Sequence, residues 1–214
     1  MNGTRHESRD NLRLALAVRP HLQRQGFKVV MSRDTDIFIE LRDRTNRANS
    51  INADLFVSLH RNAFTNPAAN GTENWVFTTP TSAELGLAGD ILEKLASVGI
   101  QSNRGVKRGN FHVLRESNMP AVMVELGFIS NARDNELFDT RFDEYAEAIA
   151  HGICQTFGLP YIPEGAVTPE PNVQWYRVQV GAFSVRANAE RFLENVRGMG
   201  LDAFLVTPDA SRGD

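Results

Sequence analysis

A histidine and a glutamate stand at the most apolar stretches of this sequence, where a polar side chain needs a chemical or structural reason. His60 directly follows residues 55–59 (LFVSL), and Glu125 lies inside residues 121–127 (AVMVELG). Imidazole and carboxylate groups bind metal ions and transfer protons. Burial would also raise the pKa of Glu125 toward the range of a general base. Two structural roles stay open: a hydrogen-bonded histidine at a strand end, and a carboxylate paired with an arginine.

A third candidate, Glu7, lies in the polar segment RHESRD at residues 5–10, just before the first predicted helix. Acidic residues are favourable at helix N-termini because of the helix dipole. Taken alone, Glu7 is therefore interpreted as a helix-terminal or solvated residue.

Alternating strand and helix patterns predict an α/β fold that positions these residues. Residues 55–59 are typical of a central strand covered on both faces, and catalytic groups gather at the carboxyl ends of parallel strands. We expect a mostly parallel sheet flanked by helices. The predicted strands are 27–31, 55–59, 73–78, 111–114 and 121–126. The predicted helices are 11–25, 41–52, 82–97, 133–137 and 142–157, and the loops include 101–109.

The composition changes after residue 158, which predicts a second domain. Residues 159–172 are rich in proline and glycine and form a predicted linker. Residues 173–214 show a strand, a helix over 187–199 and a second strand, which is a partial small α+β domain. So short a segment buries little core by itself, so we expect this domain to be cut short. The first domain then spans residues 1–158.

Charge and hydropathy exclude several classes of partner. The net charge is −3 and no basic block stands out, so no nucleic-acid partner is expected. The apolar runs are too short for a membrane span. No signal peptide follows Met1, which leaves two interpretations: a cytosolic protein, or a chain whose true N-terminus is missing.

Six segments form an ordered set of motifs along the chain. They are Glu7 with residues 11–12, GFKVVMSR at 26–33, LFVSLHRNA at 55–63, GTE at 71–73, NRGVK at 103–107 and PAVMVELGFISN at 120–131. In this order they resemble the motifs of the zinc-dependent N-acetylmuramoyl-L-alanine amidases of the amidase_3 type. The resemblance covers residues 2–157, and although each motif is weak alone, the ordered set is specific.

The resemblance implies a zinc ion held by two histidines and one glutamate, in an enzyme that cuts peptide stems from cell-wall glycan. Glu7 would be the glutamate ligand, His60 the second histidine and Glu125 the catalytic carboxylate. The bond cleaved would join the lactyl group of muramic acid to L-alanine. Asn62 and Arg104 would contact the substrate, although structural hydrogen bonds are an open alternative for both.

The sequence departs from this family at the first zinc histidine, which the family carries in a Gly-His-Gly motif. Nothing before Glu7 supplies it, and the neighbouring His6 lacks a strand to aim it. We therefore expect the 214-residue chain to be weak or inactive and its parent to be active, with a secretion signal lost upstream and an extracellular or cell-envelope location. The alternatives are a non-catalytic scaffold that binds peptidoglycan and a cytosolic protein without metal.

The tail WYRVQVGAFS at residues 175–184 resembles the first half of a sporulation-related repeat (SPOR) domain. That family binds peptidoglycan, often glycan stripped of its stems. Gln179 and Phe183 are the matching positions most typical of the motif, with a purely structural role as the alternative. Tethering an amidase to glycan would raise its local concentration on the substrate.

Overall fold

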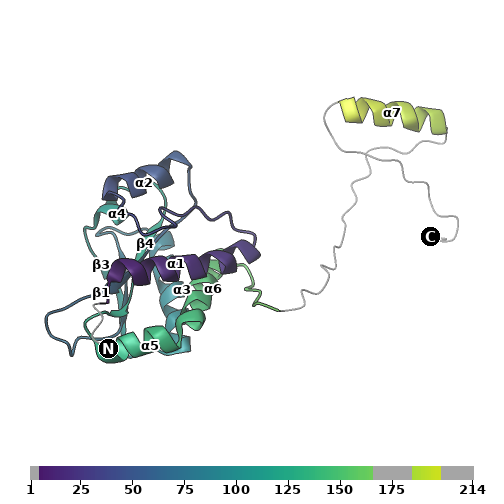
Figure 1. The fold of residues 1–214 in the computed structure, drawn as a ribbon. Helices are drawn as coiled ribbons and strands as arrows, with labels where there is room; N and C mark the ends of the chain where they lie inside the picture. Colours follow the sequence, from purple (N-terminus) through teal and green to yellow (C-terminus); the bar gives the residue numbers. More distant parts are fainter. Residues whose placement is uncertain (1–4, 166–184, 199–214) are drawn as a thin grey trace. The chain divides into compact units, whose positions relative to one another are not determined.

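The computed structural model describes residues 5–165 and 185–198. The chain divides into two compact units, Met1–Val167 and Thr168–Asp214, and each is described by itself (Figure 1). In the second unit the structure describes helix α7, Arg186–Gly198, where the sequence predicted a helix over 187–199. The predicted glycan-binding residues Gln179 and Phe183 lie outside the described residues, and the domain boundaries at 158/159 and 172/173 stay a prediction.

The first unit is built on a four-stranded sheet. Its strands are β1 (Phe56–Asn62), β2 (Thr72–Val76), β3 (Asn103–Arg108) and β4 (Ala121–Phe128). Their order is β1-β4-β2-β3, in which β1 and β4 are parallel, β2 and β3 are parallel, and β2 and β4 are antiparallel. This confirms the predicted α/β fold; the sheet is mixed, with two of its three strand pairings parallel. Glu125 is the one residue of β4 that is not fully buried.

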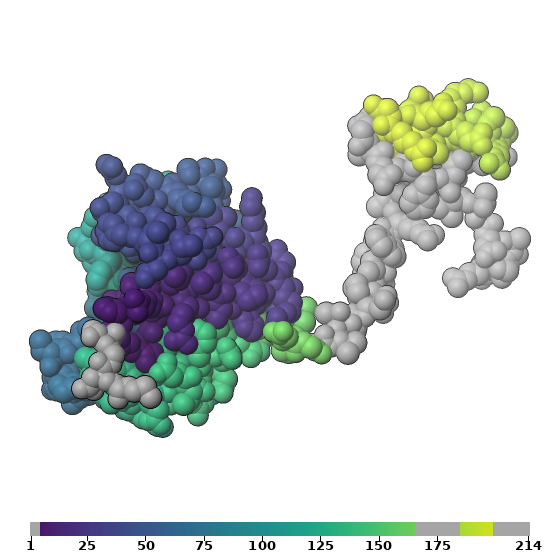
Figure 2. All heavy atoms as spheres, in the orientation of Figure 1, coloured from purple at the N-terminus to yellow at the C-terminus, as the bar shows by residue number. Residues whose placement is uncertain are grey.

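One face of the sheet carries most of the core. Helices α1 (Glu7–Arg24), α3 (Ser82–Val98) and α6 (Phe142–Thr156) pack there and bury leucine, isoleucine and alanine side chains against alternate residues of β4. Val122, Val124 and Leu126 face this core. In the space-filling view, α1 (purple) lies against α6 (green), with which it makes contact (Figure 2). The core-facing strand positions therefore leave the odd-numbered β4 residues on the other face.

The second face is covered more lightly, and it carries the candidate site. Val113 and Leu114 of the short helix α4 (His112–Arg115) pack against Ala121 and Met123 of β4. Helix α2 (Leu41–Ser50) contacts α4, whereas α5 (Ala132–Thr140) contacts β4 and packs Phe138 into the core of the first face. Because side chains alternate along a strand, Glu125 projects on the same face as Met123, beyond the apolar patch.

Several sequence predictions were wrong. Residues 27–31 form no strand, because no described strand pairs with them; Phe27 instead joins the core and packs on Phe157 with ring centroids 5.3 Å apart. The predicted loop 101–109 contains β3, a largely exposed strand at the end of the sheet. Its charged residues do not show the apolar pattern by which strands are predicted. Residues 111–114, predicted as a strand, contribute the N-cap Phe111 and the first three residues of α4, since so short a segment fits a helix as well as a strand.

Two further corrections concern the site. Strand β1, predicted to be central, is the end strand in the order of the described sheet. Helix α1 begins at Glu7, with His6 as its N-cap, so Glu7 is the first helical residue and does not precede the helix.

None of the helices in residues 5–165 and 185–198 combines the length and the hydropathy that a membrane span needs.

Candidate active site

Strand register brings His60 and Glu125 next to each other. In the parallel pairing of β1 with β4, the Cα of His60 is the partner of the Cα of Glu125. Paired residues on neighbouring strands project on the same face of a sheet, so the imidazole and the carboxyl group share one surface. The two strands thus produce the convergence that the sequence predicted for them.

Glu7 reaches the same surface from the start of α1. Its Oε1 lies 2.8 Å from Nδ1 of His60 and accepts a hydrogen bond from the Asn11 amide at 3.1 Å. The other ring nitrogen of His60 lies 3.0 Å from the Ser58 hydroxyl. Burial alone would raise the pKa of Glu7, but the hydrogen bonds from His60 and Asn11 hold it below its ordinary value. Glu7 is therefore an anion beside the imidazole at neutral pH.

Glu125 has the opposite electrostatic setting. Its Oε2 is buried, and no hydrogen-bond partner for it exists among the described residues. Desolvation, with smaller contributions from the charges of Glu7 and Glu73, raises the pKa of Glu125 to about 7, against the opposing charge of His60. A carboxyl group with a pKa near neutrality accepts and returns protons efficiently at physiological pH. The sequence alternative of a carboxylate paired with arginine does not describe Glu125.

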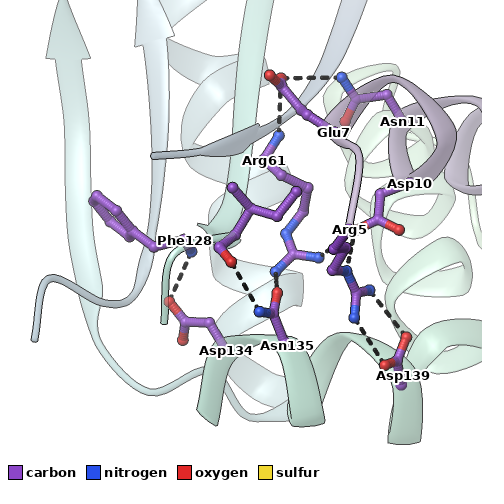
Figure 3. A network of polar contacts seen from close by, with 10 residues as sticks. Arg5, Glu7, Asp10, Asn11, Arg61, Phe128, Asp134, Asn135 and Asp139 are labelled. Carbon is purple, nitrogen blue, oxygen red and sulfur yellow. Dashed lines mark hydrogen bonds and ion pairs between the residues drawn. The ribbon is translucent and has the colours of Figure 1, made fainter. Parts of the chain in front are cut away.

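A buried arginine fixes the position of α1 relative to β1. The side chain of Arg61 is fully buried, and it donates hydrogen bonds to Asp10 at 2.9 Å and to Asn135 at 2.8 Å. Figure 3 shows Arg61 running from β1 toward these partners, with Arg5 bridging Asp10 and Asp139 nearby. Asp10 lies one helical turn after Glu7. The ion pair therefore holds the turn that presents Glu7 to His60.

The structure also reveals a carboxylate that the sequence reasoning missed. Glu73 of β2 is the antiparallel partner of Glu125 and is almost fully buried. It accepts hydrogen bonds from Arg104 Nε at 2.6 Å and from Lys107 Nζ. Burial would raise its pKa, but these two cations lower the pKa of Glu73 below its ordinary value. The signal was available, because Glu73 lies in a segment predicted to be a strand, just as Glu125 does.

The two residues expected to contact substrate both meet at Glu73. The Asn62 amide donates to Glu73 Oε1 at 3.0 Å, and Arg104 donates to Oε2. Their structural hydrogen bonds are thus real, yet the side chain of Arg104 keeps 35% of its surface exposed. This exposure leaves part of the Arg104 side chain accessible to solvent.

The donor set for a metal ion is short. Imidazole and carboxylate are ligands that zinc accepts, and His60 and Glu7 supply one of each. However, no group of three or more His, Cys, Asp or Glu side chains in the described residues is arranged to hold a metal ion.

The other histidines have different surroundings. His21 lies 2.8 Å from the Tyr161 hydroxyl, His151 stacks on the Tyr161 ring, and His112 lies 3.4 Å from the Thr45 hydroxyl. His6 is at the N-cap position of α1, where its side chain makes no capping hydrogen bond, and it is exposed. Among the described residues, His60 and Glu7 are therefore two possible zinc ligands, one fewer than the three protein ligands of a catalytic zinc site.

Comparison with known proteins places this geometry in a family. The family model described as N-acetylmuramoyl-L-alanine amidase matches residues 1–155, and a SPOR domain model matches residues 155–207. The chain is 34% identical over 202 residues to the sporulation-specific N-acetylmuramoyl-L-alanine amidase of Bacillus subtilis, covering 92% of this chain and 75% of that protein. It is 33% identical over 212 residues to the amidase CwlM of Bacillus licheniformis, covering 95% and 78%.

Solved structures agree. The catalytic domain of the amidase CwlV from Bacillus (Paenibacillus) polymyxa has a TM-score of 0.67 and 37% identity, covering 73% of this chain and 88% of that one. An N-acetylmuramoyl-L-alanine amidase from Clostridium difficile 630 has a TM-score of 0.69 and 35% identity, covering 72% and 85%. On the family match to residues 1–155 and the likeness to these enzymes, the chain belongs to the N-acetylmuramoyl-L-alanine amidases and carries a SPOR domain.

Proposed function

We propose that this chain hydrolyses the amide bond between N-acetylmuramic acid and L-alanine in peptidoglycan, with Glu125 as general base and then general acid. One observation carries the assignment of Glu125: its Oε2 atom is buried and unpartnered within residues 5–165, next to the His60–Glu7 pair, and the pKa of the carboxyl group is about 7. Glu125 takes a proton from the attacking water and delivers it to the leaving nitrogen of L-alanine.

Glu7 and His60 are the residues that would hold zinc. When bound, zinc lowers the pKa of a water molecule and polarises the amide carbonyl. The 2.8 Å hydrogen bond between Nδ1 of His60 and Oε1 of Glu7 keeps both groups that would bind the metal on the surface that they share with Glu125. Ser58 contacts the second nitrogen of the His60 ring and so fixes its orientation.

We further infer that the 214-residue chain holds zinc weakly. The described residues supply two ligands of the expected kinds, and a third His, Cys, Asp or Glu in their reach is not found in that part of the chain. The activity of this chain then depends on a high zinc concentration. The competing function, a scaffold that binds peptidoglycan without cleaving it, is favoured by the same short donor set together with the SPOR match.

Substrate recognition and location complete the proposal. Asn62 and Arg104 border the surface next to Glu125 and would contact the muramyl peptide, whereas Gln179 and Phe183 would contact glycan from the SPOR domain. Relatives named as cell-wall amidases support action in the cell envelope or outside the cell.

The test compares three forms of the chain on purified peptidoglycan in excess zinc. Release of stem peptides with a new L-alanine amino terminus should occur with the unchanged chain and fall about 100-fold or more in Glu125→Gln, the range that general acid–base catalysis contributes. Glu116→Gln, which alters an exposed carboxylate paired with Arg115, should retain full activity. Peptidoglycan binding without any release by the unchanged chain would favour the scaffold.

A further inference from the structure

A cationic cluster beside Glu125 has no role in the proton transfer proposed above. Glu73 lies at its centre with a side chain only 3% exposed, while the side chains of Arg104 and Lys107 above it are 35% and 32% exposed. The indole N–H of Trp75 donates to Glu73 Oε1 at 3.1 Å. The carboxylate therefore lies beneath two cations that both reach the surface of the protein.

The cluster carries more positive charge than its structure requires. One cation neutralises Glu73, and the second leaves a net positive charge on the surface. Within residues 5–165, the contacts of Arg104 use its Nε–H and its Nη1, which lies 3.4 Å from the Asn70 carbonyl. A guanidinium has further N–H donors, and an ammonium has three. Both side chains thus keep N–H groups from which an anionic ligand can accept hydrogen bonds.

Packing holds the two cations in place before any ligand binds. The guanidinium of Arg104 lies 5.0 Å from the centroid of the Phe128 ring, and the ammonium of Lys107 lies 5.6 Å from that of Trp75. These cation–π contacts and the shared bond to Glu73 limit the rotamers of two long side chains. A ligand that binds there loses little free energy to ordering them.

The cluster lies at a defined distance from the proposed reaction centre. Glu125 and Glu73 are partners across β4 and β2, and β3, which carries both cations, is the next strand. At a strand spacing of about 4.8 Å, the cations start about 10 Å from Glu125 and extend over the intervening Glu73. In a stem peptide, the first carboxylate beyond the cleaved bond is the α-carboxylate of the second residue, a glutamate linked through its side chain. One extended residue and a carboxyl group place it about 6–7 Å from the cleaved bond.

We infer that Arg104 and Lys107, held by Glu73, bind this α-carboxylate and make the site selective for stems in which it is free and not amidated. The inference rests on the proposed function and names the part of its substrate that the site recognises. A bidentate or paired contact to a carboxylate is the geometry that guanidinium and ammonium groups favour. Amidation removes the charge and one acceptor oxygen, so it should weaken binding.

The experiment measures binding separately from cleavage. The full chain carrying Glu125→Gln is titrated with N-acetylmuramoyl-L-alanyl-D-glutamate and with the matched D-isoglutamine compound, and affinity is read by calorimetry. Neither ligand has a third residue, so a carboxylate further along the stem cannot contribute. Arg104→Gln and Lys107→Gln are added singly to this background, since each leaves Glu73 one cation. Arg108→Gln removes the same charge from the exposed end of β3 and serves as the control.

The expected result is tighter binding of the free carboxylate by about tenfold or more. That preference should shrink in Arg104→Gln and in Lys107→Gln and persist in Arg108→Gln. Equal affinity for the two ligands, or equal loss in all three variants, would overturn the inference. A chain that cleaves peptidoglycan yet does not discriminate between the ligands would refute this selectivity and leave the proposed function standing.

Discussion

Replacing Glu125 by glutamine should stabilise the fold while lowering activity by about 100-fold or more. The carboxyl group is buried without a partner for Oε2 in the described residues, and its pKa is raised from an ordinary value of 4.5 to about 7. Above pH 7 the folded protein must therefore carry a desolvated negative charge beside two other carboxylates. Glutamine has nearly the same shape and carries no charge.

The sign and size of the effect follow from the pKa difference. Between pH 4.5 and 7 the unfolded chain has lost the Glu125 proton while the folded chain keeps it. The folded state therefore loses stability as pH rises through this window, and the loss is complete above pH 7. A shift of this size corresponds to at most about 3 kcal/mol, and partial solvent access reduces it to about 2 kcal/mol. For a chain of this length, Glu125→Gln should raise Tm by about 4–8 °C at pH 8.

The assay is thermal unfolding of both proteins from pH 4.5 to 8 in the presence of a chelator, because a bound cation near Glu125 would offset its charge. The stability gain should be near zero at pH 4.5, grow with pH and level off above 7. Glu116→Gln, which removes an equal charge from the surface, should show no comparable gain. A variant that is less stable than the unchanged chain at every pH would refute the reasoning, since it would mean that the carboxylate has stabilising partners.

Three further perturbations test the framework around the site. Arg61→Met should lower the free energy of unfolding by about 1–3 kcal/mol in chemical denaturation, because it removes one of the two cations paired with the buried Asp10 and the hydrogen bond to Asn135; an unchanged free energy of unfolding would show that this ion pair does not hold α1. Gly152→Ala should lower the free energy of unfolding by about 1–3 kcal/mol, because a Cβ atom at this position would lie 2.5 Å from the backbone of α3. Gly89→Ala is the control: a Cβ atom there has no neighbour within 4 Å, so the substitution should raise the free energy of unfolding by up to about 1 kcal/mol. Zinc should raise Tm in the unchanged chain and in His151→Ala but not in His60→Ala; an equal rise in all three would place the ion elsewhere.

The convergence of His60 with Glu125 was predictable because it depends only on strand register and position. His60 ends one apolar run and Glu125 interrupts another, and parallel strands bring the polar residues near their carboxyl ends together at one edge of a sheet. Glu7 was harder, since an acidic residue at a helix start has an ordinary electrostatic explanation. Only the resemblance to a family separated it from the many acidic residues with similar surroundings.

The wrong secondary-structure predictions share a physical cause: whether a short segment becomes a strand depends on whether another strand pairs with it in the folded protein. Residues 103–108 become a strand because β2 offers hydrogen bonds, although their own side chains are mostly polar. Residues 27–31 have a strand-like pattern and no described partner strand, so they stay irregular. Glu73 escaped notice for a related reason, since its partners Arg104 and Lys107 come from a segment that was predicted to be a loop.

The position of Glu73 explains how a site rich in cations keeps Glu125 protonated near neutral pH. Arg104 and Lys107 are both bound to Glu73, which stands between their strand and Glu125 in the sheet. Arg61, the other nearby cation, is committed to Asp10 on the core side of β1. A direct contact between any of these cations and Glu125 would lower its pKa and weaken it as a base. The sheet thus separates two functions, because it gives the cations a carboxylate of their own and leaves the neighbouring one without a partner.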